Sequence, residues 1–271
     1  MHQSTSVLPK GSKAHTSNTL APNTHHENGA IPAGSPNSAR PSHNGAVIEP
    51  LDVSSTKELD DIVCHMLPAF EGRESETNWT ARERNIITLR RLTQGNAPYA
   101  FSTHFAATMK SLLDSIYKVV NSLRTTLCTT ACALLQELAR TLGPKMDSWI
   151  DIMMNNLLKL CSNMKKLTSQ AANETIAAII DNLSYSSRLT VHILSAAGDK
   201  NTQVRLFAAG WIRSIILRHG GNPAQFDHSG GVDSYNAAIN KGLSDANPGV
   251  REAMRKAFWA FASTWPSKAL E

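Results

Sequence analysis

The sequence lacks the long apolar segments that a membrane-spanning or exported protein needs. No apolar run approaches the roughly 20 residues that cross a bilayer, and the N-terminus has no apolar signal-peptide core. We therefore expect an intracellular protein that has no membrane partner. Cysteine is also scarce, and no Cys-x-x-Cys pair indicates zinc binding or redox chemistry, so we expect buried thiols. The cysteines are Cys64, Cys128, Cys132 and Cys161.

The sequence motifs of common catalytic sites are missing as well. The chain contains no glycine-rich phosphate loop, no His-Glu-x-x-His and no Gly-x-Ser-x-Gly. Cys64 and His65 are neighbours in sequence, so they point to different faces of a helix, which is wrong for a nucleophile and its base. We expect no enzyme activity and no cofactor.

The first fifty residues contain no aromatic residue and few large apolar ones. Serine, asparagine, proline, glycine and histidine dominate, and such a segment cannot bury enough apolar surface to offset the entropy of ordering. Its histidines have no regular spacing and no cysteine nearby, so a metal-binding tract is the lesser alternative. We predict a disordered linker over residues 1–50 and a folded domain over residues 51–271.

Charge of either sign is moderate. The 27 basic and 22 acidic side chains leave a formal net charge of +5. This small excess suits an acidic protein partner, whereas a nucleic-acid partner usually requires a denser basic patch. We expect no nucleic-acid partner.

Glycine and proline are scarce between residues 51 and 219, where leucine, alanine, isoleucine and methionine recur at helical spacing. An apolar stripe at helical spacing also runs from Val250 to Phe261, near the end of the chain. Asn247 before Pro248 is typical of a helix N-cap, and Thr80 with Glu83 has the spacing of a capping box. The pattern predicts helix pairs at 56–70 with 79–93, 101–120 with 123–141, 145–161 with 166–183, 187–197 with 202–219, and 231–243 with 248–264.

The turns inside these pairs repeat. Residues 199–205 and 245–251 align position by position, both with Asp first, Asn third and Arg last. A period near 40 residues is typical of stacked HEAT-type helix pairs. We therefore predict an all-α fold, a HEAT-repeat α-solenoid, in which equivalent turns lie side by side along one edge.

Aligning the turns places one residue of each in a common column. Tryptophan and arginine, which begin this column, are enriched at interface hot spots, and a row of basic residues suits a long acidic protein surface. The column reads Trp79, Arg124, Met164, Asn201 and Asn247, with Lys165, Lys166 and Lys200 as neighbours.

Each of these residues also has a structural interpretation. Trp79 can pack the first turn onto the next repeat, and adjacent lysines are often only solvated. Arg205 and Arg251 each follow an aspartate by six residues, a spacing that also fits a ladder joining adjacent turns. The remaining tryptophans are expected in the core or at the junctions between repeats (Trp149, Trp211, Trp259 and Trp265). The arginines of the second predicted helix are mostly expected on an exposed face (Arg82, Arg84, Arg90 and Arg91).

The segment 78–84, Asn-Trp-Thr-Ala-Arg-Glu-Arg, resembles the opening of a TOG domain of the CLASP type, most closely a second TOG domain. The resemblance continues in order through residues 51–271, in the runs 89–92, 123–127, 170–174 and 245–251. It implies five to six antiparallel helix pairs. It also implies that the preceding linker joins an earlier TOG domain.

The resemblance further implies that the turns dock on αβ-tubulin without a cofactor, and that the protein promotes microtubule stabilisation and rescue. The location implied is the cytoplasm and cytoskeleton, including the mitotic spindle, with the nucleus as a second one. Spindle or kinetochore proteins are further partners implied for a full-length protein. The tubulin-binding residues implied are Trp79, Arg124, Lys165 and Lys166 on the β-tubulin side, and Lys200, Asn201, Asn247 and Arg251 on the α-tubulin side.

Two other functions remain open from the sequence. A HEAT scaffold could bind a different protein through its helix faces, in which case changes at Trp79 and the lysine pair would have no effect. Nucleic-acid binding along the basic edge is the third reading, and the modest net charge disfavours it.

Overall fold

The computed structural model describes residues 48–222, 226 and 231–269, which belong to one compact unit, His43–Glu271. The predicted linker and its histidines lie outside the described residues up to residue 47. Over the described residues the chain is helical and contains no strand. No helix in this part is long and apolar enough to cross a membrane.

The helices follow the predicted pairs closely. Their bounds are α1 Thr56–Phe70, α2 Trp79–Gln94, α3 Ala97–Ala100, α4 Ser102–Ser111, α5 Leu113–Val120, α6 Thr125–Leu142, the 3-10 helix η1 Gly143–Trp149, α7 Ile150–Cys161, α8 Lys166–Asn182, α9 Ser187–Ala197, α10 Thr202–His219, α12 Gly231–Leu243, α13 Pro248–Thr264 and α14 Pro266–Ala269.

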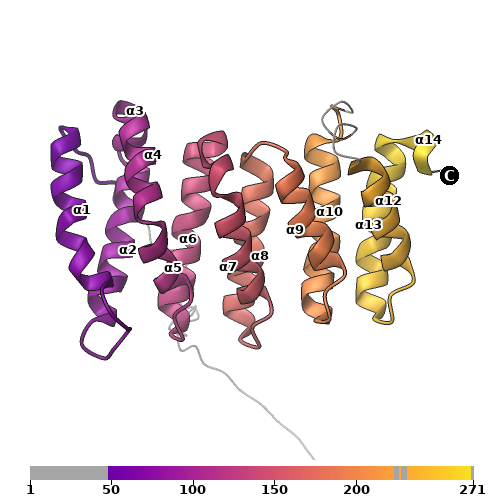
Figure 1. Ribbon diagram of the computed structural model, residues 1–271, viewed down its shortest axis with the longest axis horizontal. Helices are drawn as coiled ribbons and strands as arrows, with labels where there is room; N and C mark the ends of the chain where they lie inside the picture. Colours follow the sequence, from indigo (N-terminus) through magenta and orange to yellow (C-terminus); the bar gives the residue numbers. More distant parts are fainter. Residues whose placement is uncertain (1–47, 223–225, 227–230, 270–271) are drawn as a thin grey trace, which may run out of the picture. The chain divides into compact units, whose positions relative to one another are not determined.

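The pairs pack against one another in the order of the chain (Figure 1). The second helices of the pairs form one layer, in which α2 packs on α6, α6 on α8, α8 on α10, and α10 on α13. The first helices form the other layer, so each pair buries one side of its helices on its partner and another side on the next pair. The predicted HEAT-type solenoid is confirmed.

The first helices of the second and third pairs are less regular than predicted. Residues 101–120 form α4 and α5 instead of one helix, because Leu112 between them has φ −89° and ψ −3°. Leu112 and Leu113, at this break, are both buried. The segment before α7 is the 3-10 helix η1, which Gly143 and Pro144 begin. Gly143 has φ +52°, a conformation that favours glycine.

One predicted helix cap is confirmed and another is wrong. Asn247 accepts hydrogen bonds from the N–H groups of Gly249 and Val250, at 2.9 and 3.3 Å, with Pro248 at the first helical position. The Thr80 capping box does not form, because α2 already begins at Trp79. Asn78, which precedes that helix, uses its side chain to fold the loop before it instead.

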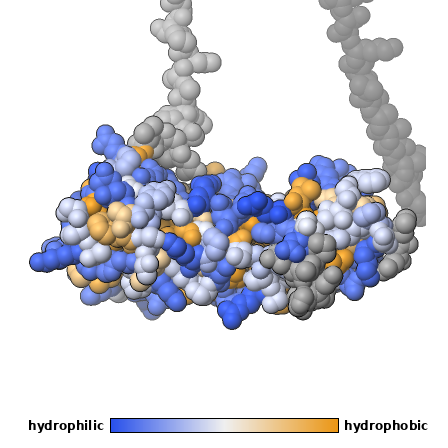
Figure 2. Space-filling view, turned by 90° about the horizontal axis from the view of Figure 1, so that it is seen from above, coloured by the Kyte–Doolittle hydropathy of each residue, from blue (hydrophilic) through white to orange (hydrophobic). Residues whose placement is uncertain are grey.

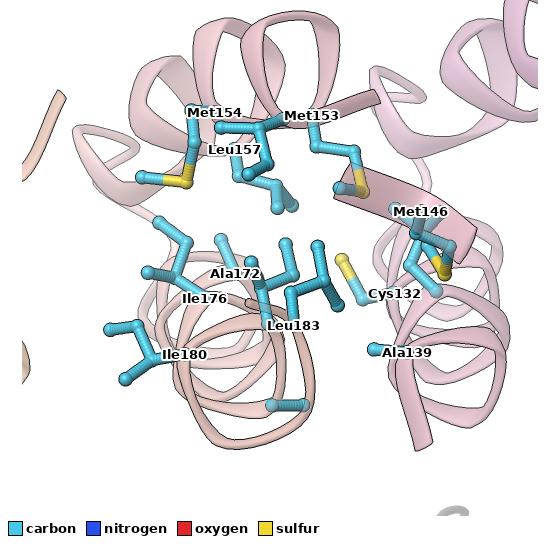
Figure 3. Close-up of a cluster of buried hydrophobic side chains, with 14 of the residues drawn as sticks. Cys132, Ala139, Met146, Met153, Met154, Leu157, Ala172, Ile176, Ile180 and Leu183 are labelled. Atoms are coloured by element: carbon cyan, nitrogen blue, oxygen red, sulfur yellow. The ribbon is translucent and has the colours of Figure 1, made fainter. Parts of the chain in front are cut away.

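The core is one continuous apolar cluster between the two helix layers. Figure 3 shows part of it, where Leu157 of α7 points toward Ala172 of α8 and Met153 lies near Met146 and Cys132. Methionine suits such a core because its flexible thioether fills irregular gaps between helices. Three of the tryptophans expected in the core are buried there, namely Trp149, Trp211 and Trp265.

Two expectations about burial are wrong. Trp259 is 67% exposed, because it lies on the outward face of α13, with its ring edge-on to that of Phe258. Cys64 is exposed on α1, whereas the other three cysteines are buried as expected. Burial raises the pKa of the Cys161 thiol to about 12, so it stays protonated and unreactive.

A candidate protein-binding edge at the turns

The turns inside the helix pairs all lie at the same end of the solenoid, the lower edge in Figure 1. We number them turn 1 (71–78), turn 2 (121–124), turn 3 (162–165), turn 4 (198–201) and turn 5 (244–247). Together with the first two residues of the helices that follow, they form what we call the turn edge. Figure 2 shows the opposite edge, where hydrophilic residues predominate and apolar ones are scattered.

Hydrogen bonds and ion pairs connect each turn to the next. Arg124 of turn 2 pairs with glutamates of turn 1, and the Lys165 ammonium of turn 3 donates to the Leu123 carbonyl of turn 2 at 2.6 Å. Asn201 of turn 4 donates to the Ser162 carbonyl at 3.4 Å, and Arg205 just after turn 4 pairs with Asp245 of turn 5. The turn edge is therefore a linked row of turns, as the repeat pattern predicted.

Trp79 and Arg124 come together at turns 1 and 2. Trp79 is half-buried at the start of α2, where its ring packs against the core. The Arg124 guanidinium carbon lies 5.2 Å from the centroid of that ring, within the range of a cation–π contact. Its nitrogen atoms also approach the carboxylates of Glu74, at 3.6 Å, and Glu76, at 2.6 Å. The sequence predicted the two column residues as neighbours, but did not predict the two glutamates.

Arg82 corrects the expectation of an exposed arginine face on α2. It is only 1% exposed, and its guanidinium donates to the carbonyl oxygens of Ala69, Glu71 and Gly72 at 2.9 to 3.0 Å. It thereby joins the end of α1 to turn 1 directly behind Trp79. The signal available in the sequence was its position three residues after Trp79, one helical turn into α2.

Of the other arginines of α2, two bond to other parts of the chain and one is exposed to solvent. Arg90 forms a two-pronged ion pair with Glu137 of α6, with a shortest distance of 2.6 Å, and so fastens two neighbouring pairs together. Arg91 is half-buried and donates to the carbonyl of Glu49 at 3.0 Å. Only Arg84 is fully exposed as expected.

Turns 2 and 3 expose apolar side chains beside their basic ones. Met164 is 100% exposed, and Leu123 and Leu167 also present most of their surface to solvent. Lys166, next to them, is exposed and has no ion pair to any described residue. The sequence placed Met164 in the column but missed Leu123 and Leu167. Their signal was that each falls beside a turn, outside the buried stripe of its helix.

Turns 4 and 5 share one hydrogen-bond pattern, as the aligned sequences suggest. Asp199 and Asp245 each accept from the N–H of the asparagine two residues on, at 2.7 and 2.8 Å. Asn201 accepts from the N–H of Gln203 at 2.9 Å, so both asparagines act as helix caps. Lys200 at the tip of turn 4 is exposed, with no ion pair among the described residues.

Arg205 and Arg251 are bound within these turns. Each uses Nη1 to donate to two carbonyl oxygens of the turn before its helix, at 2.7 to 3.0 Å. Arg205 also forms a two-pronged pair with Asp245, at 2.7 and 3.0 Å, and this pair holds the pKa of the Asp245 carboxyl below its usual range. The geometry thus fits the ladder interpretation for Arg205, which joins turns 4 and 5, whereas Arg251 bonds within turn 5 alone.

The chemistry of this edge is that of a binding surface. In the described part of the chain, no three side chains of His, Cys, Asp or Glu come together as a metal site requires. The edge offers an aromatic ring, a guanidinium, three exposed lysines and three exposed apolar side chains on a linked row of turns. Such a combination of apolar anchors and basic groups fits a large, acidic protein partner.

The architecture is that of a TOG domain. A solved structure described as "Structural Basis of Microtubule Plus End Tracking by XMAP215, CLIP-170 and EB1" matches with a TM-score of 0.64 and 19% identity, over 82% of this chain and 86% of that one. The CEP104 TOG domain matches with a TM-score of 0.55 and 10% identity, over 82% and 90% of the two chains. At these identities the likeness establishes the fold.

The sequence establishes the family. The model of the CLASP N terminal family matches residues 59–271, and the chain belongs to that family. Protein stu1 of Aspergillus fumigatus is 49% identical over 236 residues, and Protein STU1 of Coccidioides immitis is 51% identical over 226 residues. These matches cover 87% and 83% of this chain but only 18% of each relative, so the chain spans about a fifth of their length.

Proposed function

We propose that this chain is a non-catalytic tubulin-binding module of a CLASP-like protein, and that the turn edge docks on αβ-tubulin. The single observation that carries the proposal is the linked row of turns, which presents Trp79, Arg124, Lys166 and Lys200 on one surface. Membership of the CLASP N terminal family and a fold shared with TOG domains and with a structure from work on microtubule plus-end tracking support tubulin as the partner.

In this arrangement Trp79 and Arg124 contact β-tubulin, with Lys165 and Lys166 beside them. Burying the exposed Met164 and its leucine neighbours adds an apolar contribution, at roughly 25 cal/mol for each Å² removed from water. Binding energy in an interface is usually concentrated in a few residues, among which tryptophan and arginine are enriched.

The far end of the turn edge reaches α-tubulin in the same arrangement. Lys200 is the exposed charge there, and the two capping residues Asn201 and Asn247 lie at the tips of the last two turns. Arg251 already donates to two carbonyls of its own turn. We therefore assign its main role to the conformation of turn 5 and not to contact with the partner.

The hydrogen bonds between successive turns support this proposal energetically. A surface that is already ordered loses less conformational entropy when it binds. Arg82 fixes turn 1 and the Arg205–Asp245 pair fixes turns 4 and 5, so little rearrangement is needed before docking.

For the whole protein, we propose stabilisation and rescue of microtubules, in the cytoplasm and on the cytoskeleton including the mitotic spindle. Further spindle or kinetochore partners belong to the same proposal. Within the family, the Trp-x-x-Arg-Glu opening at residues 79–83 supports placing this chain as a second TOG domain.

A second candidate function rests on a different surface. Trp259 and Leu217 are exposed on the outward faces of α13 and α10, which pack side by side. A scaffold that binds another protein through its helix faces would use such exposed residues, and exposed tryptophans are frequent interface anchors.

Two matched substitutions separate the two functions. Size-exclusion chromatography with unpolymerised αβ-tubulin would compare the wild-type chain with Trp79→Glu and Trp259→Glu. The turn-edge proposal expects Trp79→Glu to abolish co-elution and Trp259→Glu to preserve it. Because Trp79 is half-buried, a Lys166→Glu and Lys200→Glu double variant, which changes only exposed side chains, repeats the test. Co-elution that survives both turn-edge variants would refute the proposal.

A further inference from the structure

Two acidic side chains of turn 1 contact Arg124, a basic residue of the turn edge. Glu76 lies 2.6 Å from Nη2 of Arg124, and Glu74 lies 3.6 Å from its Nε. Among the lysines proposed to contact the partner, none has a carboxylate within ion-pair distance in the described residues. The acidic pair is therefore confined to the place where the proposed hot spot lies.

The two glutamates are not equivalent. The Glu74 side chain is only 20% exposed, and its Oε2 is buried without a hydrogen-bond partner among the described residues. The Glu76 side chain is 86% exposed, so it meets Arg124 from the solvent side. Glu74 thus stands behind the guanidinium, whereas Glu76 occupies the position from which a partner would approach.

Arg124 does not need Glu76 to stay in place. Glu74 and the Trp79 ring, 5.2 Å from the guanidinium carbon, still hold the arginine when Glu76 moves away. An exposed ion pair contributes little to stability, because two solvated side chains are fixed for a weak attraction in water. A carboxylate of a docking protein can therefore take the place of Glu76.

We propose that Glu76 is an internal competitor for Arg124, and that it sets the affinity and salt dependence with which the turn edge binds an acidic protein surface. This inference rests on the proposed function, since it requires Arg124 to face the partner. Glu76 weakens binding in two ways: it occupies a donor of Arg124, and its charge repels the carboxylate that approaches. Glu74 has the opposite effect, since it positions Arg124 over Trp79.

The test uses the full chain with Glu76→Gln, which keeps the shape of the side chain and removes its charge. The control is Glu49→Gln, which makes the same change in net charge at an exposed residue near Arg91, at the far end of α2. The dissociation constant for unpolymerised αβ-tubulin would be measured at several salt concentrations, starting at about 50 mM, where screening is weak.

We expect Glu76→Gln to bind about two- to fivefold more tightly than the wild type at low salt, the range of one exposed ion pair. The gain should shrink as salt rises, and Glu49→Gln should bind like the wild type. If Glu76→Gln bound tubulin no more tightly than the wild type, this inference would be overturned and the proposed function would stand. Failure of the wild type itself to bind tubulin would overturn both.

Discussion

The Arg205–Asp245 pair makes turns 4 and 5 one unit, so we expect its loss to cost more than an ordinary surface change. The guanidinium meets both carboxylate oxygens, at 2.7 and 3.0 Å, and donates to two carbonyls of turn 4. The two side chains are only 17% and 12% exposed. Arg205→Met keeps the side-chain stem and removes all of these bonds. We expect the free energy of unfolding to fall by about 2 kcal/mol, between the values for exposed and buried ion pairs.

Arg251→Met is the matched control for this prediction. Arg251 donates to two carbonyls of its own turn but makes no ion pair to a neighbouring turn. Its replacement should lower the free energy of unfolding by about 1 kcal/mol, the contribution of ordinary hydrogen bonds. Urea unfolding near pH 7, followed by the circular dichroism of the helices, measures both differences.

The pH dependence gives the same prediction a second readout. The hydrogen bond from Arg205 is the largest cause of the lowered pKa of Asp245. A carboxyl with a lowered pKa in the folded chain stabilises the fold above its unfolded pKa of about 3.9, and that stability is lost as the pH falls through the folded value. The Arg205→Met penalty should therefore be complete near pH 7 and shrink below about pH 4. A penalty near pH 7 no larger than that of Arg251→Met, or one unchanged in acid, would show that the Arg205–Asp245 pair does not stabilise the fold in this way.

Three further predictions follow from individual contacts. Arg82→Met should lower the free energy of unfolding by about 3 kcal/mol, because three backbone carbonyls lose a charged donor; a loss below about 1 kcal/mol in urea unfolding would contradict this. Asn247→Ala should lower the free energy of unfolding by about 1 kcal/mol, because an N-cap is lost. Thr80→Ala should change it by less than about 0.5 kcal/mol, and equal losses would show that Thr80 does cap α2. Cys64 should react readily with a thiol reagent in the native chain while Cys161 stays protected until unfolding, and equal rates would be inconsistent with this burial.

The helix pairs could be predicted from sequence because they depend on local periodicity. Apolar residues at helical spacing fix which segments are helical, and the Asn247-Pro248 pair marks where one helix begins. The period of the turns then gives the solenoid, since each pair has to bury its sides on its neighbours. The breaks at Leu112 and η1 escaped prediction, because packing in the assembled core decides them.

The partners of the site residues could not be predicted in the same way. Arg124 meets Glu76 across 48 residues of sequence, and nothing local distinguishes that glutamate from any other. Arg82 was expected in solvent because arginine is seldom buried, yet three carbonyls at the end of α1 and in turn 1 satisfy it. Trp259 is predicted in the core or at a repeat junction, yet it lies on the outward face of α13.

Hydrogen exchange of the chain with and without unpolymerised αβ-tubulin locates the bound surface without any substitution. If the turn edge binds tubulin, exchange should slow in turns 1 to 5 and in the first residues of the helices that follow them. The outward residues of α13 around Trp259 should exchange at the same rate in both states. Protection confined to α10 and α13, with turns 1 to 3 unchanged, would contradict the claim that the turn edge binds tubulin.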